Sequence, residues 1–217
     1  MRPFLKVCCI SSIEEARLAV SFGADAVGLV SDMPSGPGVI DDALIEEIVA
    51  AVPPPVATFL LSSREEADGL AEHVAATKTG VLQIVRHIDP GHYAELRARV
   101  PTTKLVQVVH VEDERSVDLA ISYAGLADAL LLDSGRPGGA GEQLGGTGRT
   151  HNWELSAEIV KRAGKPVFLA GGLAPDNVRE AVETVAPHGI DLCSGLRTNG
   201  ALDRGKLKAF TSALWSP

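Results

Sequence analysis

Short apolar segments alternate with amphipathic stretches along the whole chain. The short segments are rich in Val, Leu and Ile and lack the alternating polar residues of a strand with one solvated face. Such runs are typical of strands buried on both faces of a parallel sheet. They predict eight strands: Phe4–Cys8, Ala26–Val30, Pro55–Leu61, Val81–Val85, Leu105–Val111, Ala129–Asp133, Pro166–Ala170 and Gly189–Ser194.

The stretches between these strands carry signals for the starts and ends of helices. Ser12–Glu15 and Ser63–Glu66 have capping-box spacing, in which each residue can satisfy the other's backbone N–H. Further candidates for an N-cap or a first helical turn are Asp113, Asn152, Asp203 and Pro175. The glycines expected to end helices in the left-handed conformation are Gly23, Gly80, Gly125, Gly164 and Gly189.

The number of units predicts the fold class. Eight strands alternating with eight helices in 217 residues leave about 27 residues per unit. This predicts an α/β protein with a single (β/α)8 TIM barrel over residues 1–217, because the shortest barrels of this kind have ~200 residues. The alternative is an open doubly wound sheet, but no G-x-G-x-x-G follows the first strand, and eight is the number at which a barrel closes.

Composition excludes several functional classes. The formal net charge is −8 with 4 % aromatic residues and no basic cluster, which argues against nucleic-acid binding. No apolar run approaches the ~20 residues of a membrane span, and no signal-peptide core is present, so we expect no membrane partner. Three cysteines make no disulfide framework, so Cys9 and Cys193 are expected to be packing residues in a cytoplasmic protein.

Barrel enzymes carry their active sites at the C-terminal ends of the strands, and the first strand ends there with two reactive groups. Successive side chains of a strand point to opposite faces, so Lys6 and Cys8 share one face. A lysine is expected to avoid the apolar helix layer, so both side chains should point into the barrel. Cys8 is then either a small buried residue or a thiol whose pKa the ammonium lowers, able to act as base or nucleophile. The residues alone leave both interpretations open.

The sixth strand ends in a carboxylate, Asp133. The structural interpretation is a cap or a loop-orienting hydrogen bond. The functional interpretation, which a strand-end position in a barrel favours, is a general acid or base whose pKa is set by burial.

Glycine-rich turns follow the last three strands. They contain Gly146 within Gly145–Gly148, the pair Gly171 and Gly172, and Ser194 with Gly195. Glycine-rich turns expose backbone N–H groups to anions, and barrels commonly hold phosphate after strands seven and eight. The first turn closes a connection of 18 residues with seven glycines, from Ser134 to His151, which is typical of a functional or disordered loop.

Other polar residues have less specific interpretations. The histidines lack the spacing of metal ligands, so no metal is expected. Arg86 and Arg197 lie at or just past strand ends, either as anion contacts or as solvated side chains.

Several segments together resemble one known family. They are Lys6-Val7-Cys8, Leu131–Ser134, Gly145–Thr150 with Trp153, Leu169–Leu173 with Asn177-Val178, and Asp191–Gly195. Over nearly the whole chain these segments resemble phosphoribosylanthranilate isomerase, a (β/α)8 barrel of the phosphate-binding group that acts in tryptophan biosynthesis.

The resemblance implies an Amadori rearrangement of N-(5'-phosphoribosyl)anthranilate to 1-(2-carboxyphenylamino)-1-deoxyribulose 5-phosphate, an aldose–ketose isomerisation. Asp133 would match the general acid that opens the furanose ring, and Cys8 the general base that removes the C2 proton. Backbone amides around Gly146, Gly172 and Gly195 would hold the phosphate. No cofactor is implied, and monomer and homodimer both remain open.

The chain departs from the family pattern at the anthranilate end. Gly38 stands where an arginine that meets the anthranilate carboxylate is expected, and Cys9 replaces the glycine after the catalytic cysteine. Arg86 and Arg197 are new at strand ends, so recognition of the carboxylate could have moved to either of them. Lys6 is a further candidate for contact with the substrate.

Three hypotheses follow from this combination. The first is the isomerase itself, with a relocated carboxylate partner. The second is a divergent barrel isomerase acting on a different phosphosugar, because the arginine is missing at Gly38. The third is a non-catalytic phosphate-ligand binder, against which the retention of Cys8 and Asp133 argues.

Overall fold

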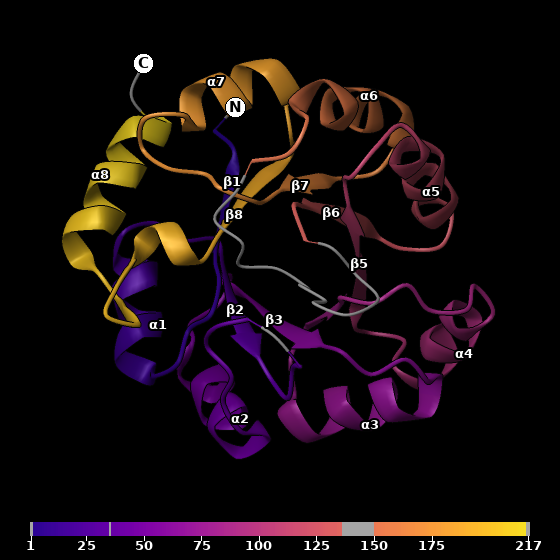
Figure 1. Ribbon diagram of the computed structural model, residues 1–217. Helices are drawn as coiled ribbons and strands as arrows, with labels where there is room; N and C mark the ends of the chain where they lie inside the picture. Colours follow the sequence, from indigo (N-terminus) through magenta and orange to yellow (C-terminus); the bar gives the residue numbers. More distant parts are fainter. Residues whose placement is uncertain (1, 35, 136–149, 216–217) are drawn as a thin grey trace.

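The computed structural model describes residues 2–34, 36–135 and 150–215. Eight parallel strands close into a barrel in sequence order, as Figure 1 shows along the barrel axis. The strands are β1 (Phe4–Val7), β2 (Ala26–Val30), β3 (Ala57–Ser62), β4 (Val81–Ile84), β5 (Lys104–His110), β6 (Ala129–Asp133), β7 (Val167–Leu169) and β8 (Gly189–Leu192).

Helices cover the outside of the barrel (Figure 1). They are α1 (Ile13–Ser21), α2 (Asp42–Ala51), α3 (Ala67–Thr77), α4 (His92–Arg99), α5 (Arg115–Ala124), α6 (Trp153–Ala163), α7 (Val178–Val185) and α8 (Arg204–Trp215). A short 3-10 helix η1 (Ser194–Leu196) and a small hairpin of β9 (Arg197–Thr198) and β10 (Ala201–Leu202) connect β8 to α8.

The closed parallel barrel confirms the predicted fold class, with strand ends displaced by at most two residues. Closure is set by β1, which pairs with β2 on one side and with β8 on the other. In the second pairing Lys6 lies opposite Asp191 and Val7 opposite Leu192. The first and last strands therefore bring their C-terminal ends together.

The predicted helix N-caps are partly confirmed. Ser12 caps α1, with Glu15 N donating to its Oγ at 3.1 Å, and Asn152 and Asp203 cap α6 and α8. Asp113 accepts from Arg115 N at the start of α5. The capping box at Ser63–Glu66 is wrong: α3 starts at Ala67 without a side-chain cap, and Ser63 Oγ donates to the carbonyl of Asp32.

The helix ends and the Pro175 turn also differ in part from expectation. Gly23 and Gly164 are left-handed as expected, with φ of +82° and +60°. The left-handed residues at the ends of α3 and α7 are instead Lys78 and Ala186, while Gly80, Gly125 and Gly189 have ordinary negative φ or extended backbone. Pro175 lies in a turn before α7 rather than in the helix.

Alternation sorts the strand residues into two apolar layers. Residues such as Leu5, Val7 and Leu60 face outward and pack under the helices. Residues such as Phe59, Val106 and Leu131 fill the barrel interior. Phe4, Phe59 and Phe168 close its N-terminal end, with ring centroids 5.5 and 6.0 Å apart. The polar inward residues therefore gather toward the other end, which we call the mouth.

Gly28 on β2 makes room for the functional side chains of β1. A Cβ at this position would lie 2.7 Å from Cys8 Sγ and 3.0 Å from Lys6 Nζ. Its φ is not positive, so space rather than backbone conformation requires glycine here.

Two expectations about the cysteines are corrected. Cys9 and Cys193 are not separate packing residues but form a disulfide between the ends of β1 and β8, with Cα atoms 5.8 Å apart. The sequence could not show this pairing because the two residues are 184 positions apart. Cys8 is the free cysteine, and it is buried.

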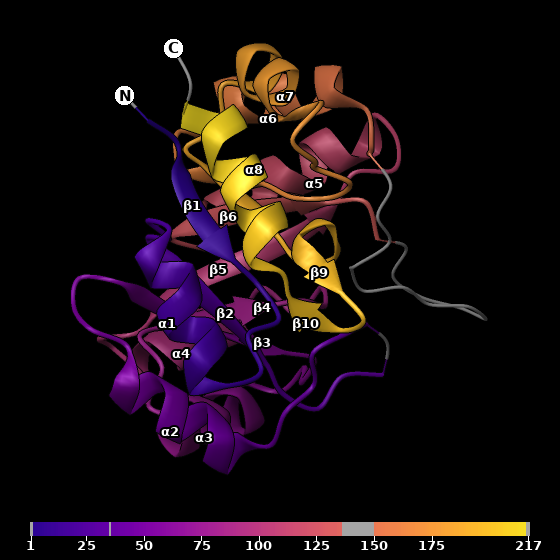
Figure 2. The same cartoon turned by 90° about the vertical axis from the view of Figure 1, so that its left-hand side faces the viewer.

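The ends of the described chain meet at the closed end of the barrel. The guanidinium of Arg2 lies 5.0 Å from the centroid of the Trp215 ring and also pairs with Asp25. Figure 2 shows both termini on the side away from the β9–β10 hairpin. Across the described residues, no helix is long and apolar enough to span a membrane.

We expect Gly28→Ala to lower the free energy of unfolding by about 1–3 kcal/mol, the usual cost of overpacking a filled interior. Gly80→Ala is the matched control, because a Cβ there meets nothing within 4 Å and its φ is not positive. Urea unfolding of the two variants measures the difference. Equal stability of both variants would show that the space beside Cys8 and Lys6 is not tight.

Candidate active site at the mouth of the barrel

A buried ion pair forms the floor of the site. Lys6 Nζ lies 2.9 Å from Asp191 Oδ1, and both side chains are nearly inaccessible to water. Burial alone would lower the pKa of Lys6, but the Asp191 carboxylate and the Cys8 sulfur together raise it above the usual value. Lys6 is therefore a cation whose charge is balanced inside the barrel.

Asp191 was missed as a functional residue by the sequence reasoning. The available signal was a carboxylate inside an otherwise apolar strand, Gly189-Ile190-Asp191-Leu192. An inward lysine on β1 requires a counter-charge, and the neighbouring strand of a closed barrel is where such a partner belongs.

Cys8 lies beside this pair, at the C-terminal end of β1. Its amide donates to the carbonyl of Leu192 at 2.7 Å, which ties the end of β1 to β8. The thiol points inward as expected and interacts with Lys6. Of the two interpretations left open for Cys8, the lowered pKa is not the one found: burial raises the pKa of the thiol to about 11, and Asp191 adds to this against the lowering effect of Lys6.

Asp133 ends β6 at the same level of the mouth. Its Oδ1 accepts a hydrogen bond of 2.7 Å from the amide of Ser134. Burial raises the pKa of Asp133 to about 6, and the nearby Asp191 carboxylate adds to this, against the Ser134 N–H and Lys6. A carboxyl with such a pKa is partly protonated near neutral pH and can act as a general acid.

The predicted phosphate residues after β7 and β8 come together. A cavity of about 40 Å³ is lined by residues from the two turns and by both site carboxylates: Asp133, Ala170, Gly171, Gly172, Leu173, Asp191, Leu192, Cys193, Ser194 and Gly195. We call the Gly171–Gly172 and Ser194–Gly195 turns the cradle. Gly146 lies outside the described residues.

The backbone of the cradle suits an anion. Gly171 and Gly172 are left-handed, with φ of +82° and +61°. A Cβ on Gly195 would lie 2.8 Å from the carbonyl oxygen of Leu173, so the two turns pack closely. The amides of Gly172 and Gly195 donate to no acceptor in the described parts of the chain. Backbone N–H groups in such turns are donors of the kind that bind anions.

Asn177 fixes the first turn of the cradle. Its Nδ2 donates to the carbonyl of Gly172 at 3.0 Å, and its Oδ1 accepts from the amide of Ala174 at 2.8 Å. These bonds fix the backbone around the left-handed glycines, so the turn is preorganised.

The two arginines differ in their surroundings. Arg86 follows β4 and is half-buried, with its Nε 3.5 Å from Glu65 Oε1. Arg197 is bound to Glu15 on α1, with Nη2 2.9 Å from Oε2, and donates to the carbonyls of Gly200 and Cys9. The guanidinium of Arg197 is thus held by protein partners between β9 and α1.

The loop after β2 explains the glycine at position 38. Gly38 is left-handed, with φ of +81°, and a Cβ there would lie 2.5 Å from Cβ of Cys9. The turn at Cys9 therefore occupies the space into which a side chain at this position would start.

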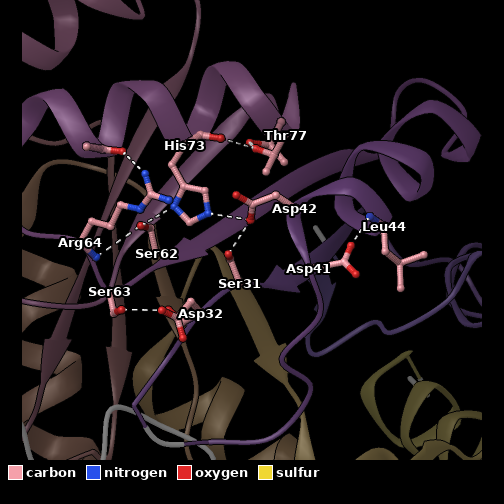
Figure 3. Close-up of polar contacts among 12 residues, drawn as sticks. Ser31, Asp32, Asp41, Asp42, Leu44, Ser62, Ser63, Arg64, His73 and Thr77 are labelled. Carbon is pink, nitrogen blue, oxygen red and sulfur yellow. Dashed lines mark hydrogen bonds and ion pairs between the residues drawn. The ribbon is translucent and has the colours of Figure 1, made fainter.

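A hydrogen-bonded chain of polar residues supports the same loop from outside the barrel (Figure 3). Ser62 Oγ lies 2.8 Å from His73 Nδ1, His73 Nε2 lies 3.1 Å from Asp42 Oδ1, and Ser31 Oγ donates to Asp42 at 2.6 Å. Burial lowers the pKa of His73 more than Asp42 raises it. Ser62 is fully buried, so this Ser–His–Asp arrangement connects β2, β3 and their helices rather than presenting a nucleophile.

Comparisons with known proteins point to one family. The model of N-(5'phosphoribosyl)anthranilate (PRA) isomerase matches residues 5–213. The N-(5'-phosphoribosyl)anthranilate isomerase of Haloferax volcanii is 36 % identical over 211 residues, covering 96 % of this chain and 91 % of the relative. The crystal structure of phosphoribosyl anthranilate isomerase from Thermotoga maritima gives a TM-score of 0.84 at 27 % identity, covering 98 % of each chain.

A further crystal structure of a phosphoribosyl anthranilate isomerase is a complex with reduced 1-(o-carboxyphenylamino)-1-deoxyribulose 5-phosphate. It gives a TM-score of 0.81 at 25 % identity and covers 98 % of each chain.

Asp133 is expected to make stability depend on pH. Its folded pKa lies above the unfolded value, so its stabilising contribution is present below pH ~4 and is lost as pH rises through 6. We expect Asp133→Asn to raise the free energy of unfolding by about 2–3 kcal/mol at pH 8 and by little at pH 4. Denaturant titrations at both pH values measure this.

Asp68→Asn serves as the control for that experiment, because its side chain is 67 % exposed on α3. A gain from Asp133→Asn that is equal at pH 4 and pH 8 would contradict the raised pKa.

Proposed function

The chain belongs to the N-(5'-phosphoribosyl)anthranilate isomerase family, and we propose that it carries out that aldose–ketose isomerisation through Asp133 as acid and Cys8 as base. The reaction converts N-(5'-phosphoribosyl)anthranilate to 1-(2-carboxyphenylamino)-1-deoxyribulose 5-phosphate, a step of tryptophan biosynthesis. We infer the cytoplasm as the compartment from the biosynthetic family alone, because the Cys9–Cys193 disulfide removes the argument from cysteine usage.

One observation carries the proposal. A carboxyl of pKa about 6 and an inward thiol lie at the mouth around the Lys6–Asp191 pair, and the carboxyl lines the same cavity as the glycine cradle. A phosphosugar whose phosphate sits in the cradle is therefore held with its sugar over the barrel axis, between the two proton-transfer groups.

The first chemical step is ring opening. Asp133 donates its proton to the furanose ring oxygen while the bond between that oxygen and C1 breaks. The lone pair of the anthranilate nitrogen forms a C1=N⁺ double bond, so the ring oxygen leaves as a hydroxyl and Asp133 becomes a carboxylate. Burial of Asp133 favours this donor role, because it raises the pKa of the carboxyl to about 6 and so increases the fraction that carries a proton.

The second step is proton abstraction from C2. The Cys8 thiolate removes the C2 proton, and the electrons of the C–H bond neutralise the iminium to give an enolamine. Proton gain at C1 and proton loss from the C2 hydroxyl then give the ketone. The iminium charge next to the thiol favours the thiolate, which offsets the raised pKa of Cys8 in the free protein.

The number of protons that Asp133 and Cys8 hold together follows from their two pKa values. Between pH ~6 and ~11 Asp133 and Cys8 together hold one proton, and in the free protein it resides mainly on the thiol. The reactive tautomer has that proton on Asp133. Lys6, in contact with the thiol, stabilises this tautomer by attracting the thiolate.

Arg86 is our candidate for recognition of the anthranilate carboxylate, in place of a side chain at position 38. It follows the C-terminal end of β4, with its Nε 3.5 Å from Glu65 Oε1, whereas the guanidinium of Arg197 is bound by Glu15 and by two backbone carbonyls. The family relationship favours anthranilate over a different phosphosugar, which was the alternative raised by Gly38.

A phosphorylated small molecule is thus the partner that we propose for the cradle. Gly146 would extend the cradle from the loop after β6, as the family resemblance implies. Solved relatives include a dimeric enzyme from Thermotoga maritima and monomers made from it, so either state is compatible with this fold.

We expect the purified protein to consume N-(5'-phosphoribosyl)anthranilate, which is fluorescent. Cys8→Ala and Asp133→Asn should each lower kcat by about 10²–10⁴-fold, because each removes one proton-transfer group. Product binding should persist in both variants, since the cradle is built from backbone. Substrate turnover followed by fluorescence measures the effect. Unchanged kcat in either variant would remove that residue from the mechanism.

We expect Arg86→Ala to raise KM about tenfold or more with a smaller change in kcat, because a charge-assisted hydrogen bond contributes about 1.5–3 kcal/mol. Arg115→Ala, at an exposed arginine on α5, is the matched control. Steady-state kinetics on the same substrate distinguish the two. An unaltered KM for Arg86→Ala would exclude Arg86 as the carboxylate partner.

A further inference from the structure

The residue after Cys8 has an unusual backbone conformation. Cys9 has φ of +61°, in the left-handed region that residues with a β-carbon rarely adopt, and it is buried. This turn directs the chain out of β1, so the position of the Cys8 thiol depends on it. A left-handed non-glycine residue persists only where its surroundings hold it.

The disulfide is the first of the contacts that hold this turn. Cys9 is bonded to Cys193, which directly precedes the Ser194–Gly195 part of the cradle. The amide of Cys8 donates to Leu192, one residue before Cys193. The thiol and the cradle are therefore joined through a covalent bond as well as through the sheet.

A partly buried ion pair reinforces the same junction. Arg197 donates to the carbonyl of Cys9, and its guanidinium is paired with Glu15. Glu15 also accepts from the amides of Ser11 and Leu202. These bonds fix the β9–β10 hairpin against the turn, so Cys9 is held through both its side chain and its carbonyl.

The loop after β2 closes the remaining side. Gly38 packs so closely on Cys9 that a Cβ would lie within 2.5 Å of Cys9 Cβ and 3.1 Å of its carbonyl oxygen. The turn at position 9 is thus enclosed by β8, the hairpin and this loop, and movement of Cys9 would displace all three.

We propose that Cys9 and Cys193 are positioning residues of the isomerase reaction, whose bond holds the left-handed turn that sets the Cys8 thiol relative to the cradle. The inference rests on the proposed function of Cys8 as base. General-base catalysis requires the thiol within hydrogen-bond reach of the C2 proton, and a misplacement of about 1 Å can cost ~10²-fold in rate.

Two double variants separate the bond from the backbone conformation. Cys9→Ser with Cys193→Ser removes the bond and keeps a β-carbon at position 9. Cys9→Gly with Cys193→Ser removes the same bond but supplies a residue that adopts positive φ freely. Cys8 remains the free cysteine in both, so a single thiol is followed throughout.

We expect the serine variant to lose about tenfold or more in kcat, with KM changed less than threefold because the cradle glycines are retained. The glycine variant should recover most of kcat despite lacking the bond. Denatured wild-type protein should contain one titratable thiol. Three thiols, wild-type kcat in the serine variant, or equal losses in both double variants would each overturn the proposal.

A readout independent of turnover distinguishes this proposal from the proposed function. We expect iodoacetamide to alkylate Cys8 at least tenfold faster at pH 8 in the serine variant than in wild type, and at the wild-type rate in the glycine variant. If the wild type does not turn over the substrate but this contrast holds, the function fails and the positioning of Cys8 stands. Equal alkylation in all three proteins overturns the positioning.

Arg2→Ala is the control for general destabilisation. It removes the ion pair with Asp25 and the contact with Trp215 at the closed end of the barrel, far along β1 from Cys8. It should lower the melting temperature while leaving kcat and the alkylation rate unchanged. A loss of kcat in Arg2→Ala equal to that in the serine variant would show that stability alone explains the effect.

Discussion

The buried pair of Lys6 and Asp191 is the constraint on which the site depends. An ammonium inside a barrel must have a counter-charge, and the register of β1 against β8 places Asp191 directly opposite Lys6. Lys6 also lies beside Gly28, where a Cβ would come 3.0 Å from its Nζ, and the Asp191 carboxylate adds to the burial that raises the pKa of Cys8. The same carboxylate also adds to the burial that raises the pKa of Asp133 to about 6. One ion pair therefore connects barrel closure to acid–base chemistry.

The two ends of the ligand are recognised by different means. In the proposed site the phosphate is met by backbone amides, in turns that Asn177 and the close packing at Gly195 hold in place, so few side-chain identities matter there beyond glycine. In the proposed site the aglycone end relies on Arg86 after β4, in place of a side chain at position 38 after β2. Gly38 illustrates the reason: once Cys9 occupies the space beside it, a long side chain cannot start from that position.

Features set by neighbouring residues could be predicted from the sequence, whereas contacts between residues far apart in the chain could not. Continuous apolar runs located all eight strands, because burial on both faces of a strand leaves a direct imprint on the residues. Cys8 and Asp133 could be placed at the mouth because each ends a strand. The pairs Cys9–Cys193 and Glu15–Arg197 join residues more than 180 positions apart, so no window along the chain contains both. The pKa of Cys8 could not be decided from the chain for a related reason: it depends first on burial and then on Lys6 and Asp191, and Asp191 lies on the last strand.

The meeting of Arg2 and Trp215 at the closed end has a consequence for architecture. Because both ends of the described chain leave the barrel opposite the mouth, additional polypeptide at either end would extend away from the ligand. The barrel can therefore be fused to another catalytic domain without a change in the active site. It can also be circularly permuted, with its two ends linked and new ends placed in a surface loop. Such modularity belongs to the geometry of the barrel and not to its chemistry.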